Sequence, residues 1–345
     1  MSTPRTEVPT ARTRAWLVRI GRVLLVAVLS WLALRLIRGI DWDKVLSAIT
    51  DLAWWQAVVL VLAGVLRLAV LSGVLFVLIE TLRYPQALAN ESAGAAVSTI
   101  APDPSDVVVR LAMFRSWRIE TTSATSGLTL RILGFYVVRL AVPVLGFVLF
   151  WIAREYSSGF SWLALVGGTG ALLLLGGLVL ALRAAKSAAF VGSTLGKVVG
   201  GLRPAGGGPE IWSGRVVEFQ SHSADRVRRH GATAALVLLL YVLVETGVLI
   251  TCLSFAGVRI DPGIVLVLGC SFLVVYPMNG LPMMGLGVLD AAYIAFVTDY
   301  SDLDPTDLLG GMIVWRLTVQ VLPVLLGLTT LAWWRRTTGA SAESA

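Results

Sequence analysis

The amino-acid sequence predicts an all-α polytopic membrane protein. The chain has 345 residues, of which 57% are hydrophobic and only 14% are charged, and its mean hydropathy is +0.81. An ordinary soluble domain carries about 25% charged residues. The apolar residues also gather into stretches of about 20, the length that a helix needs to cross a bilayer. We therefore expect six full spans plus two re-entrant hairpins, or eight spans, in a single transmembrane domain.

The elements begin with a tail and continue as long apolar segments. Residues 1–19 are rich in Thr, Pro and Arg and are expected to form a disordered basic tail, and residues 20–336 form the membrane domain. The first span resembles the core of a signal peptide, but Arg35 and Arg38 stand where cleavage needs small residues, so we expect a retained anchor. Residues 337–345 form a C-terminal tail. The six segments long enough to span are 21–37, 54–80, 125–153, 162–182, 232–256 and 308–334.

Two pairs of shorter apolar pieces lie between these spans, in residues 86–118 and 262–298. Each piece is short for a crossing, and proline with glycine or an acidic residue separates the two pieces of a pair. Backbone without helical hydrogen bonds cannot face lipid, so such breaks are buried in protein or line a polar cavity. We interpret both pairs as re-entrant hairpins, with tilted full spans as the alternative. The residues that mark the breaks are Pro102, Pro104, Pro282, Gly285 and Gly287.

The distribution of lysine and arginine orients the chain. Basic residues gather in the N-terminal tail, in residues 81–123 and 183–230, and at the C-terminal end, whereas the connections on the other side carry Lys44, Arg154 and Arg259. We therefore expect a multi-pass cell-membrane protein with both termini in the cytoplasm. Its basic face meets anionic lipid head groups, so no nucleic-acid partner is needed to explain the net charge of +7.

With this orientation, the order of span, hairpin and span occurs twice in opposite directions, which indicates a possible inverted repeat. A local similarity agrees with the repeat: the sequence around Arg139 and Pro143 resembles the sequence around Arg316 and Pro323. Between the two halves, residues 183–230 form a cytoplasmic linker. Apolar residues and arginines follow helical spacing from 210 to 229, which predicts an amphipathic helix that anchors in the membrane interface, or alternatively a regulatory contact with anionic lipid.

Charged residues within the apolar segments are the candidate substrate-binding residues. A charge at the bilayer centre costs at least ~2.5 to 3.5 kcal/mol on insertion scales, so such residues mark substrate pathways or ion pairs. The planar guanidinium of arginine matches a phosphate through two hydrogen bonds, which suits an anionic head group. The alternatives are a structural pair of Glu245 with one arginine, and helix capping by the acidic residues of the breaks. The candidates are Arg67, Asp106, Arg110, Arg131, Arg139, Glu245, Asp290 and Arg316.

We expect no metal, no cofactor and no catalytic residue. Cys252 and Cys270 lie in apolar runs without metal or disulfide spacing, and His222 and His230 lie in a basic loop. The sequence also contains no recognisable nucleotide-binding loop and no nucleophile with an adjacent base. An enzyme is therefore the less favoured class, although acidic residues of the breaks leave acid–base chemistry open.

Three stretches resemble the lysylphosphatidylglycerol synthase transmembrane region, also called the flippase-like family. In that family the second break is a proline, a Gly-rich turn, Gly-Val and a glutamate; here Asp290 replaces the glutamate. The first break departs further, because Pro102-Asp103-Pro104 replaces a Pro-Gly-Gly-like turn. The stretches that carry the resemblance are residues 101–117 with the arginine-bearing span that follows, residues 281–290, and Trp315-Arg316-Leu317 with Pro323 and Gly327.

The resemblance implies a role in moving a lipid between leaflets. Bifunctional relatives carry a soluble aminoacyl-transfer domain after the membrane part, and we expect none in this chain. We therefore expect a flippase or transporter for a phospholipid or a lipid-linked anionic head group. The alternatives are a membrane-embedded enzyme of phospholipid or polyprenyl-phosphate metabolism and an accessory scaffold for a separate lipid-modifying enzyme. Membrane lipids with anionic head groups are the expected partners, and the oligomeric state is left open.

Overall fold

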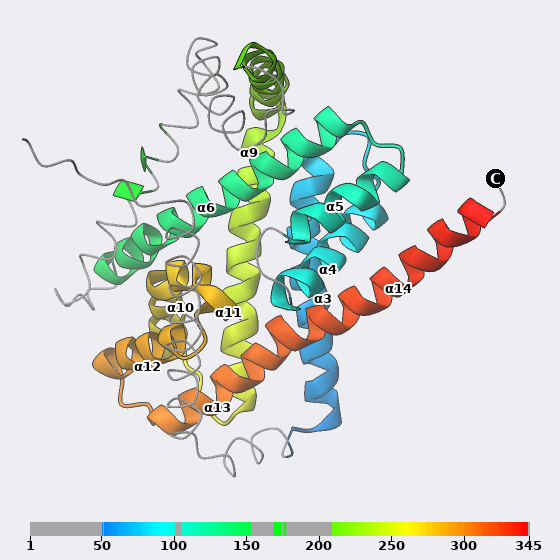
Figure 1. Ribbon diagram of the computed structural model, residues 1–345. Coiled ribbons are helices and arrows are strands. Elements are labelled where there is room, and N and C mark those ends of the chain that lie inside the picture. The colour runs from blue at the N-terminus through cyan, green and yellow to red at the C-terminus, as the bar shows by residue number, and fades with distance from the viewer. Residues whose placement is uncertain are drawn as a thin grey trace, which may run out of the picture. The chain divides into compact units, whose positions relative to one another are not determined.

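The computed structural model shows helices and no strand in the residues that it describes (Figure 1). These residues all belong to one unit of the chain, Ala48–Ala345. They are residues 50, 52–100, 105–152, 169–170, 172–173, 176 and 209–343. The predicted features that lie outside them are the tail 1–19, the span 21–37, most of the span 162–182, the linker residues 183–208, and Pro102 and Pro104.

Five helical segments of the described part are long and apolar enough to cross a membrane. Each of the predicted spans 54–80, 125–153, 232–256 and 308–334 coincides with one of them, and the fifth begins the pair predicted at 262–298. The protein is therefore an all-helical integral membrane protein. The five segments are α3 (Trp54–Leu78), α6 (Thr121–Ile152), Ala224–Phe255 of α9 (Pro209–Phe255), Pro262–Gly280, and Pro305–Thr337.

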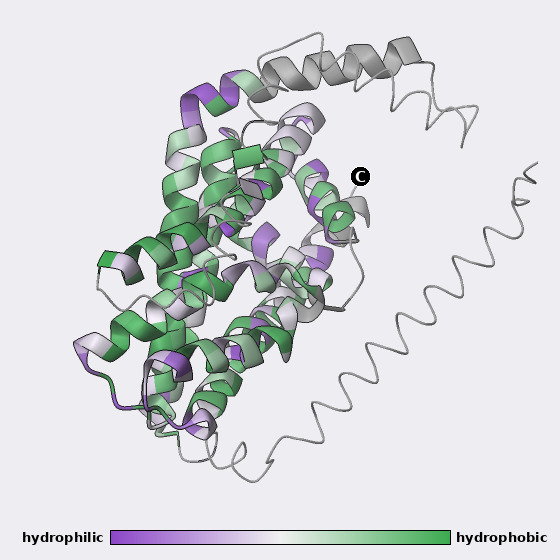
Figure 2. Cartoon of the chain, turned by 90° about the vertical axis from the view of Figure 1, so that its left-hand side faces the viewer, coloured by the Kyte–Doolittle hydropathy of each residue, from purple (hydrophilic) through white to green (hydrophobic). Residues whose placement is uncertain are grey.

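The surface of α3 shows how the sequence directs one face of a helix toward lipid. Val58, Leu62 and Leu66 follow at intervals of four residues and are 49%, 62% and 54% exposed, whereas Gly64 and Arg67 lie on the buried face of the same helix. The helices are apolar along most of their length, and hydrophilic residues gather at their ends and in the loops (Figure 2). An exposed apolar stripe of this kind is the surface that contacts acyl chains.

The amphipathic segment predicted at 210–229 is joined directly to the following span. One helix, α9, runs from Pro209 to Phe255, because the intervening sequence contains no proline and Gly231 is a tolerated helix residue, costing about 1 kcal/mol relative to alanine. The basic residues of this segment thus belong to the same helix as the buried Glu245.

Two pairs of shorter helices lie between the long ones. The first pair is α4 (Tyr84–Ile100) and α5 (Ser105–Ser116), with 17 and 12 residues. The second pair is α10 (Pro262–Val275) and α12 (Val288–Tyr300), with 14 and 13 residues. At 1.5 Å per residue, each of these helices is shorter than the roughly 30 Å of hydrocarbon in a bilayer.

Irregular backbone joins the helices of the second pair. A short 3₁₀ helix, η2 (Tyr276–Gly280), and the single turn α11 (Pro282–Gly285) occupy this place; we refer to residues 276–287 as the second break. Asp261 caps the start of α10, where its side chain accepts a hydrogen bond from the Ile264 N–H at 2.9 Å. The residues of the second break are thus held between two well-defined helices.

The final long segment changes its helical period next to Arg316. It consists of α13 (Pro305–Arg316), a π-helical turn η3 (Leu317–Val321) and α14 (Leu322–Glu343). The wider turn lies against α3, where a Cβ on Gly64 would lie 3.2 Å from the carbonyl oxygen of Thr318. Single π-turns inside α-helices often occur at functional sites.

The helices pack as pairs that mix the two halves of the chain. Helix α3 packs along α9, α4 along α14, and α10 along α6. Figure 1 shows α3 and α9 side by side and running in opposite directions. Glycines allow the last two pairs to approach closely. Gly327 of α14 lies against the backbone of Ser92 in α4, and a Cβ on Gly146 of α6 would lie 3.0 Å from the carbonyl oxygen of Cys270 in α10.

Candidate functional site

All eight charged residues that the sequence predicts for substrate binding lie in described helices. The structure sorts them into three ion-paired groups and one arginine without an acidic partner among the described residues. The groups lie at three places: between α3 and α9, between α4, α5 and α6, and between α12 and α13.

The first group joins Arg67 of α3 to Glu245 of α9. Nε and Nη2 of Arg67 donate to Oε1 of Glu245 at 3.2 and 2.7 Å. The other oxygen of the carboxylate accepts from the Tyr276 hydroxyl at 2.7 Å, and Arg67 Nη2 also donates to the Tyr241 hydroxyl at 2.5 Å. Both charged side chains are buried. This is the structural pair that the sequence offered as an alternative for Glu245, and its partner is Arg67.

The second group surrounds Glu91 of α4, which the sequence analysis did not select. Arg110 of α5 donates to both oxygens of Glu91, at 3.0 and 3.3 Å, and Nη2 of Arg131 in α6 donates to Oε1. Asp106 accepts from Nε of Arg110 at 3.2 Å. Two hydrogen bonds join the Asn90 side chain to Arg110. Nδ2 of Asn90 donates to the backbone carbonyl of Arg110 at 3.1 Å, and Nη1 of Arg110 donates to Oδ1 of Asn90 at 3.2 Å. Two arginines and two carboxylates leave this group without net charge.

The guanidinium of Arg110 lies directly on the backbone of Gly94, where a Cβ would lie only 2.1 Å from its Cζ. A glycine is therefore needed at this point of α4 for the second group to form. Nε of Arg131 is buried without a hydrogen-bond partner, so the group is nearly but not completely satisfied.

The third group joins Asp290 of α12 to Arg316 of α13. Nε of Arg316 lies 2.9 and 3.0 Å from the two carboxylate oxygens, and its Nη2 lies 2.7 Å from Oδ2. Asp290 also accepts from the Gly287 N–H at 2.7 Å, so the capping role and the ion-pair role that the sequence offered occur together. Nη2 of Arg316 reaches the carbonyl of Gly285 at 3.4 Å, whereas its Nη1 is buried without a partner.

The backbone of the second break contains three residues with positive φ: Met284 at 54°, Gly285 at 64° and Gly287 at 79°. A Cβ on Gly285 would lie 2.5 Å from the carbonyl oxygen of Met278, so both conformation and space require glycine there. Met284 adopts the left-handed region with a side chain, and such residues cluster at ligand-binding and switch segments. Pro282 begins the turn α11. The break therefore has a defined, tightly packed backbone next to Arg316.

Arg139 of α6 also reaches the second break, at Gly280. A Cβ on Gly280 would lie 2.9 Å from its Nη1, and its guanidinium lies 4.5 Å from the ring centroid of Phe135. No carboxylate of the described residues forms an ion pair with it. Its Nε is buried without a hydrogen-bond partner, and so is Oδ1 of the neighbouring Asn279. Arg139 is thus a cation that faces the break without an acidic neighbour in this part of the chain.

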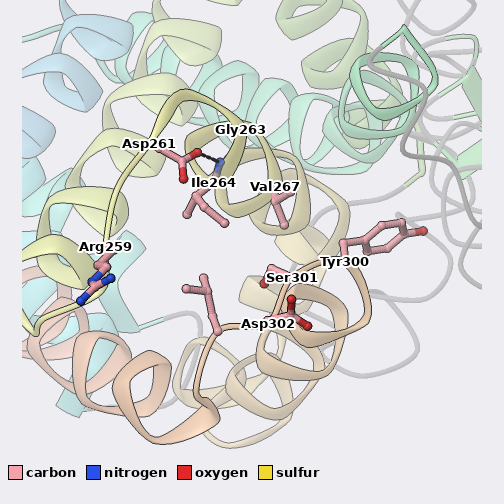
Figure 3. A pocket seen from close by; sticks show the side chains of 9 residues that line it. Arg259, Asp261, Gly263, Ile264, Val267, Tyr300, Ser301 and Asp302 are labelled. Atoms are coloured by element: carbon pink, nitrogen blue, oxygen red, sulfur yellow. Dashed lines mark hydrogen bonds between the residues drawn. The ribbon is translucent and has the colours of Figure 1, made fainter.

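A pocket of about 410 Å³ lies at the other end of the second pair, where α10 begins and α12 ends (Figure 3). Arg259 and Asp302 stand on different sides of it, and Ile264 and Val267 form part of its wall. None of the residues predicted to bind substrate lines this pocket. We therefore place the candidate site at the second break, where Arg139, Asn279 and Arg316 meet the irregular backbone.

The sequence analysis missed the partners that determine which charges are neutralised. Glu91 is the acidic residue of an alanine-rich helix, and that position in an apolar environment was the available signal. Tyr241 and Tyr276 look like ordinary core aromatics until the structure places their hydroxyls on the Arg67–Glu245 pair. Asn279 directly precedes Gly280 in the break, and an amide at membrane depth was its signal.

Within the described residues, no group of three or more His, Cys, Asp or Glu side chains has the arrangement of a metal site. The two cysteines, Cys252 and Cys270, are buried, and neither is part of a disulfide.

The family model described as "Lysylphosphatidylglycerol synthase TM region" matches residues 19–327 of the chain. No curated protein matches the chain. The matched range includes every residue of the candidate site and all three ion-paired groups.

Proposed function

Since the chain belongs to the family of the lysylphosphatidylglycerol synthase TM region, and is therefore a membrane protein of lipid metabolism or transport, we propose that it is a flippase. It moves a phospholipid or a lipid-linked anionic head group between the two leaflets. The head group binds at the second break, and its phosphate contacts Arg139.

The observation that carries this proposal is that the guanidinium of Arg139 has no carboxylate partner among the described residues. The other arginines of the described membrane helices that the sequence selected each have a carboxylate, in the pairs Arg67–Glu245, Arg110–Glu91, Arg131–Glu91 and Arg316–Asp290. A cation in an apolar bundle is costly unless an anion accompanies it. A phosphate can supply that charge and can accept two parallel hydrogen bonds from the guanidinium. The described residues give Arg139 no anionic partner, and an anionic head group has the chemistry to serve as one.

Re-entrant hairpins and an inverted repeat are part of the proposal. Counted along their helices, Ser92 in α4 and Cys270 in α10 occupy the same position, the ninth. Each packs against a glycine from the other half of the chain: Ser92 against Gly327, and Cys270 against Gly146. Each of these glycines follows a proline within four residues, Pro323 and Pro143 respectively. This correspondence supports a two-fold relation between α4 with α14 and α10 with α6. In inverted-repeat transporters, the substrate binds where the repeats meet.

The proposed orientation follows the distribution of basic residues. Both termini and the basic end of α9 face the cytoplasm of a cell membrane, and the pocket beside Arg259 faces the opposite side. In this arrangement the second pair of helices enters the membrane from outside and reverses at the break.

Reconstitution into liposomes tests the proposed function. A fluorescent anionic phospholipid in the inner leaflet is followed by its exposure to an impermeant quencher. We expect transport by the full chain, loss of most transport in Arg139→Gln, and poor rescue by Arg139→Lys, because lysine keeps the charge but lacks the planar fork. Arg229→Gln is the matched control, since Arg229 is exposed at the basic end of α9. Equal transport by Arg139→Gln and the unmodified protein would contradict the proposal.

A further inference from the structure

We propose that Asn279 makes the site selective for lipids whose head group carries a hydrogen-bond donor next to the phosphate. The ligand class is a phospholipid with a hydroxyl or an N–H group close to its phosphodiester. This inference rests on the proposed function, because it assumes that the phosphate contacts Arg139.

The side chain of Asn279 is only 5% exposed, and its Oδ1 is buried without a hydrogen-bond partner. A buried amide oxygen without a donor loses the hydrogen bond that water gave it, and most buried polar atoms in native proteins therefore have a partner. Arg139 does not satisfy this oxygen, because no hydrogen bond joins the Asn279 and Arg139 side chains. An acceptor and a cation thus stand unsatisfied at neighbouring points of the break.

The two groups are held close together by the backbone. Asn279 directly precedes Gly280, and a Cβ on Gly280 would lie 2.9 Å from Nη1 of Arg139. A phosphate on Arg139 therefore places the next atoms of its head group within reach of residue 279. One ligand can satisfy both groups if it presents an oxyanion first and a donor a few bonds later.

The surrounding residues fix the position of Asn279. It belongs to η2, whose first residue, Tyr276, donates its hydroxyl hydrogen to Glu245. The Leu281 N–H closes the turn by donating to the carbonyl of Met278 at 3.0 Å. The Arg67–Glu245 pair thus holds one end of η2, and the acceptor does not need to be ordered when a ligand binds. Preorganised polar groups of this kind discriminate strongly against ligands that lack the complementary group.

The discriminating feature is the donor and not the net charge. Phosphatidylethanolamine and phosphatidylcholine have equal charge, but methylation removes every N–H donor from the second head group. Phosphatidylinositol and phosphatidylethanol are both anionic, but the second lacks hydroxyls. A side-chain amide oxygen distinguishes the members of each pair, whereas an electrostatic site treats them alike.

The test measures binding of short-chain versions of these four lipids to the full chain in detergent. We expect the unmodified protein to bind the donor-bearing member of each pair about tenfold more tightly, the effect of one buried acceptor left unpaired. Asn279→Leu should reduce both ratios to within about twofold, and Met113→Leu, a control at a buried residue of α5 outside the break, should keep them. Gel-filtration profile and thermal midpoint check that each variant is folded.

The outcomes separate this inference from the proposed function. Equal binding of both members of each pair by the unmodified protein overturns the role of Asn279, and this result needs no variant. A preference that survives in folded Asn279→Leu overturns it as well. If Arg139→Gln leaves the affinity of all four lipids unchanged, the phosphate contact, and with it the proposed site, is wrong. A loss of affinity in Arg139→Gln with the ratios retained, together with lost ratios in Asn279→Leu, supports both.

Discussion

Arg67 and Glu245 stand 178 residues apart in the chain and meet at 2.7 Å between α3 and α9. Their pairing fixes the two helices that lie side by side at the centre of Figure 1. Because Tyr276 of η2 binds the same carboxylate, the pair also supports the second break. Glu245 therefore links three elements of this structure: α3 through Arg67, its own helix α9, and η2 through Tyr276.

Removing one partner of this pair should destabilise the protein strongly. A single buried charge without its partner costs about 3–5 kcal/mol, so Arg67→Gln and Glu245→Gln should each lower the thermal midpoint in detergent. The double variant should be much less unstable than the sum of the two changes, because no charge is left uncompensated. Strictly additive losses would show that the two residues do not interact as described.

A methyl group at Gly280 should disturb the site without unfolding the protein. The Cβ of Gly280→Ala would lie 2.9 Å from Nη1 of Arg139, and the flexible guanidinium would move away at little cost to stability. We expect an unchanged thermal midpoint but transport reduced by up to about 100-fold, the effect that a displacement of about 1 Å can have on a functional contact. Gly247→Ala is the control, since its Cβ would meet nothing within 4 Å. Normal transport by Gly280→Ala would show that the position of Arg139 does not matter for transport.

The two close helix crossings should both depend on glycine, in a predictable order. At Gly327 an added Cβ would collide with the carbonyl of Ser92, whereas at Gly146 it would lie 3.0 Å from the nearest atoms. We expect Gly327→Ala to destabilise the protein by about 1–3 kcal/mol, the usual cost of overpacking, and so to lower the thermal midpoint clearly. Gly146→Ala should have a smaller effect. Gly247→Ala should be neutral. An unaffected Gly327→Ala would mean that α4 and α14 do not cross at this residue.

Cysteine labelling should confirm or refute the proposed orientation. Cys252 and Cys270 are buried, so they give a low background. Asp302→Cys, at an exposed position beside the pocket, should react with an impermeant reagent added to intact cells. Arg229→Cys, where the native side chain is 64% exposed, should react only after the membrane is permeabilised. Reaction of both positions from the same side would rule out the assignment of opposite faces to the pocket and the basic end of α9.

Apolar segment length and composition were sufficient to predict the all-helical class and four of the long helical segments in the described residues. The predicted span 54–80 became α3 (Trp54–Leu78), and the pair 262–298 became α10 and α12 with irregular backbone between them. The all-helical membrane class and the family resemblance are both confirmed. The junction of the amphipathic segment with the span of α9 was not predicted, because a change in surface polarity along a helix looks like a boundary in a sequence.

The charged residues of the membrane helices could be selected from the sequence, but their pairing could not. Arg139 and Arg316 occupy similar local sequences, yet Asp290 neutralises Arg316 and no described carboxylate neutralises Arg139. That difference depends on packing between α12 and α13, and helical spacing carries no information about contacts between distant helices. Asp106 and Arg110 are the exception, because a spacing of four residues on one helix already brings them together.

The neutral pairing of Arg67, Arg110, Arg131 and Arg316 has a consequence for the proposed transport in an energised membrane. In the described bundle the three ion-paired groups carry no net charge, so the electric field acts chiefly on Arg139. A voltage of 100 mV is worth about 2.3 kcal/mol for one elementary charge that crosses the whole membrane. A lipid with a single negative charge would cancel the charge of Arg139, and the loaded site would then move without electrical work. The voltage would instead act on the return of the empty, positively charged site. The transport rate should therefore depend on voltage only if this return is slower than the movement of the loaded site.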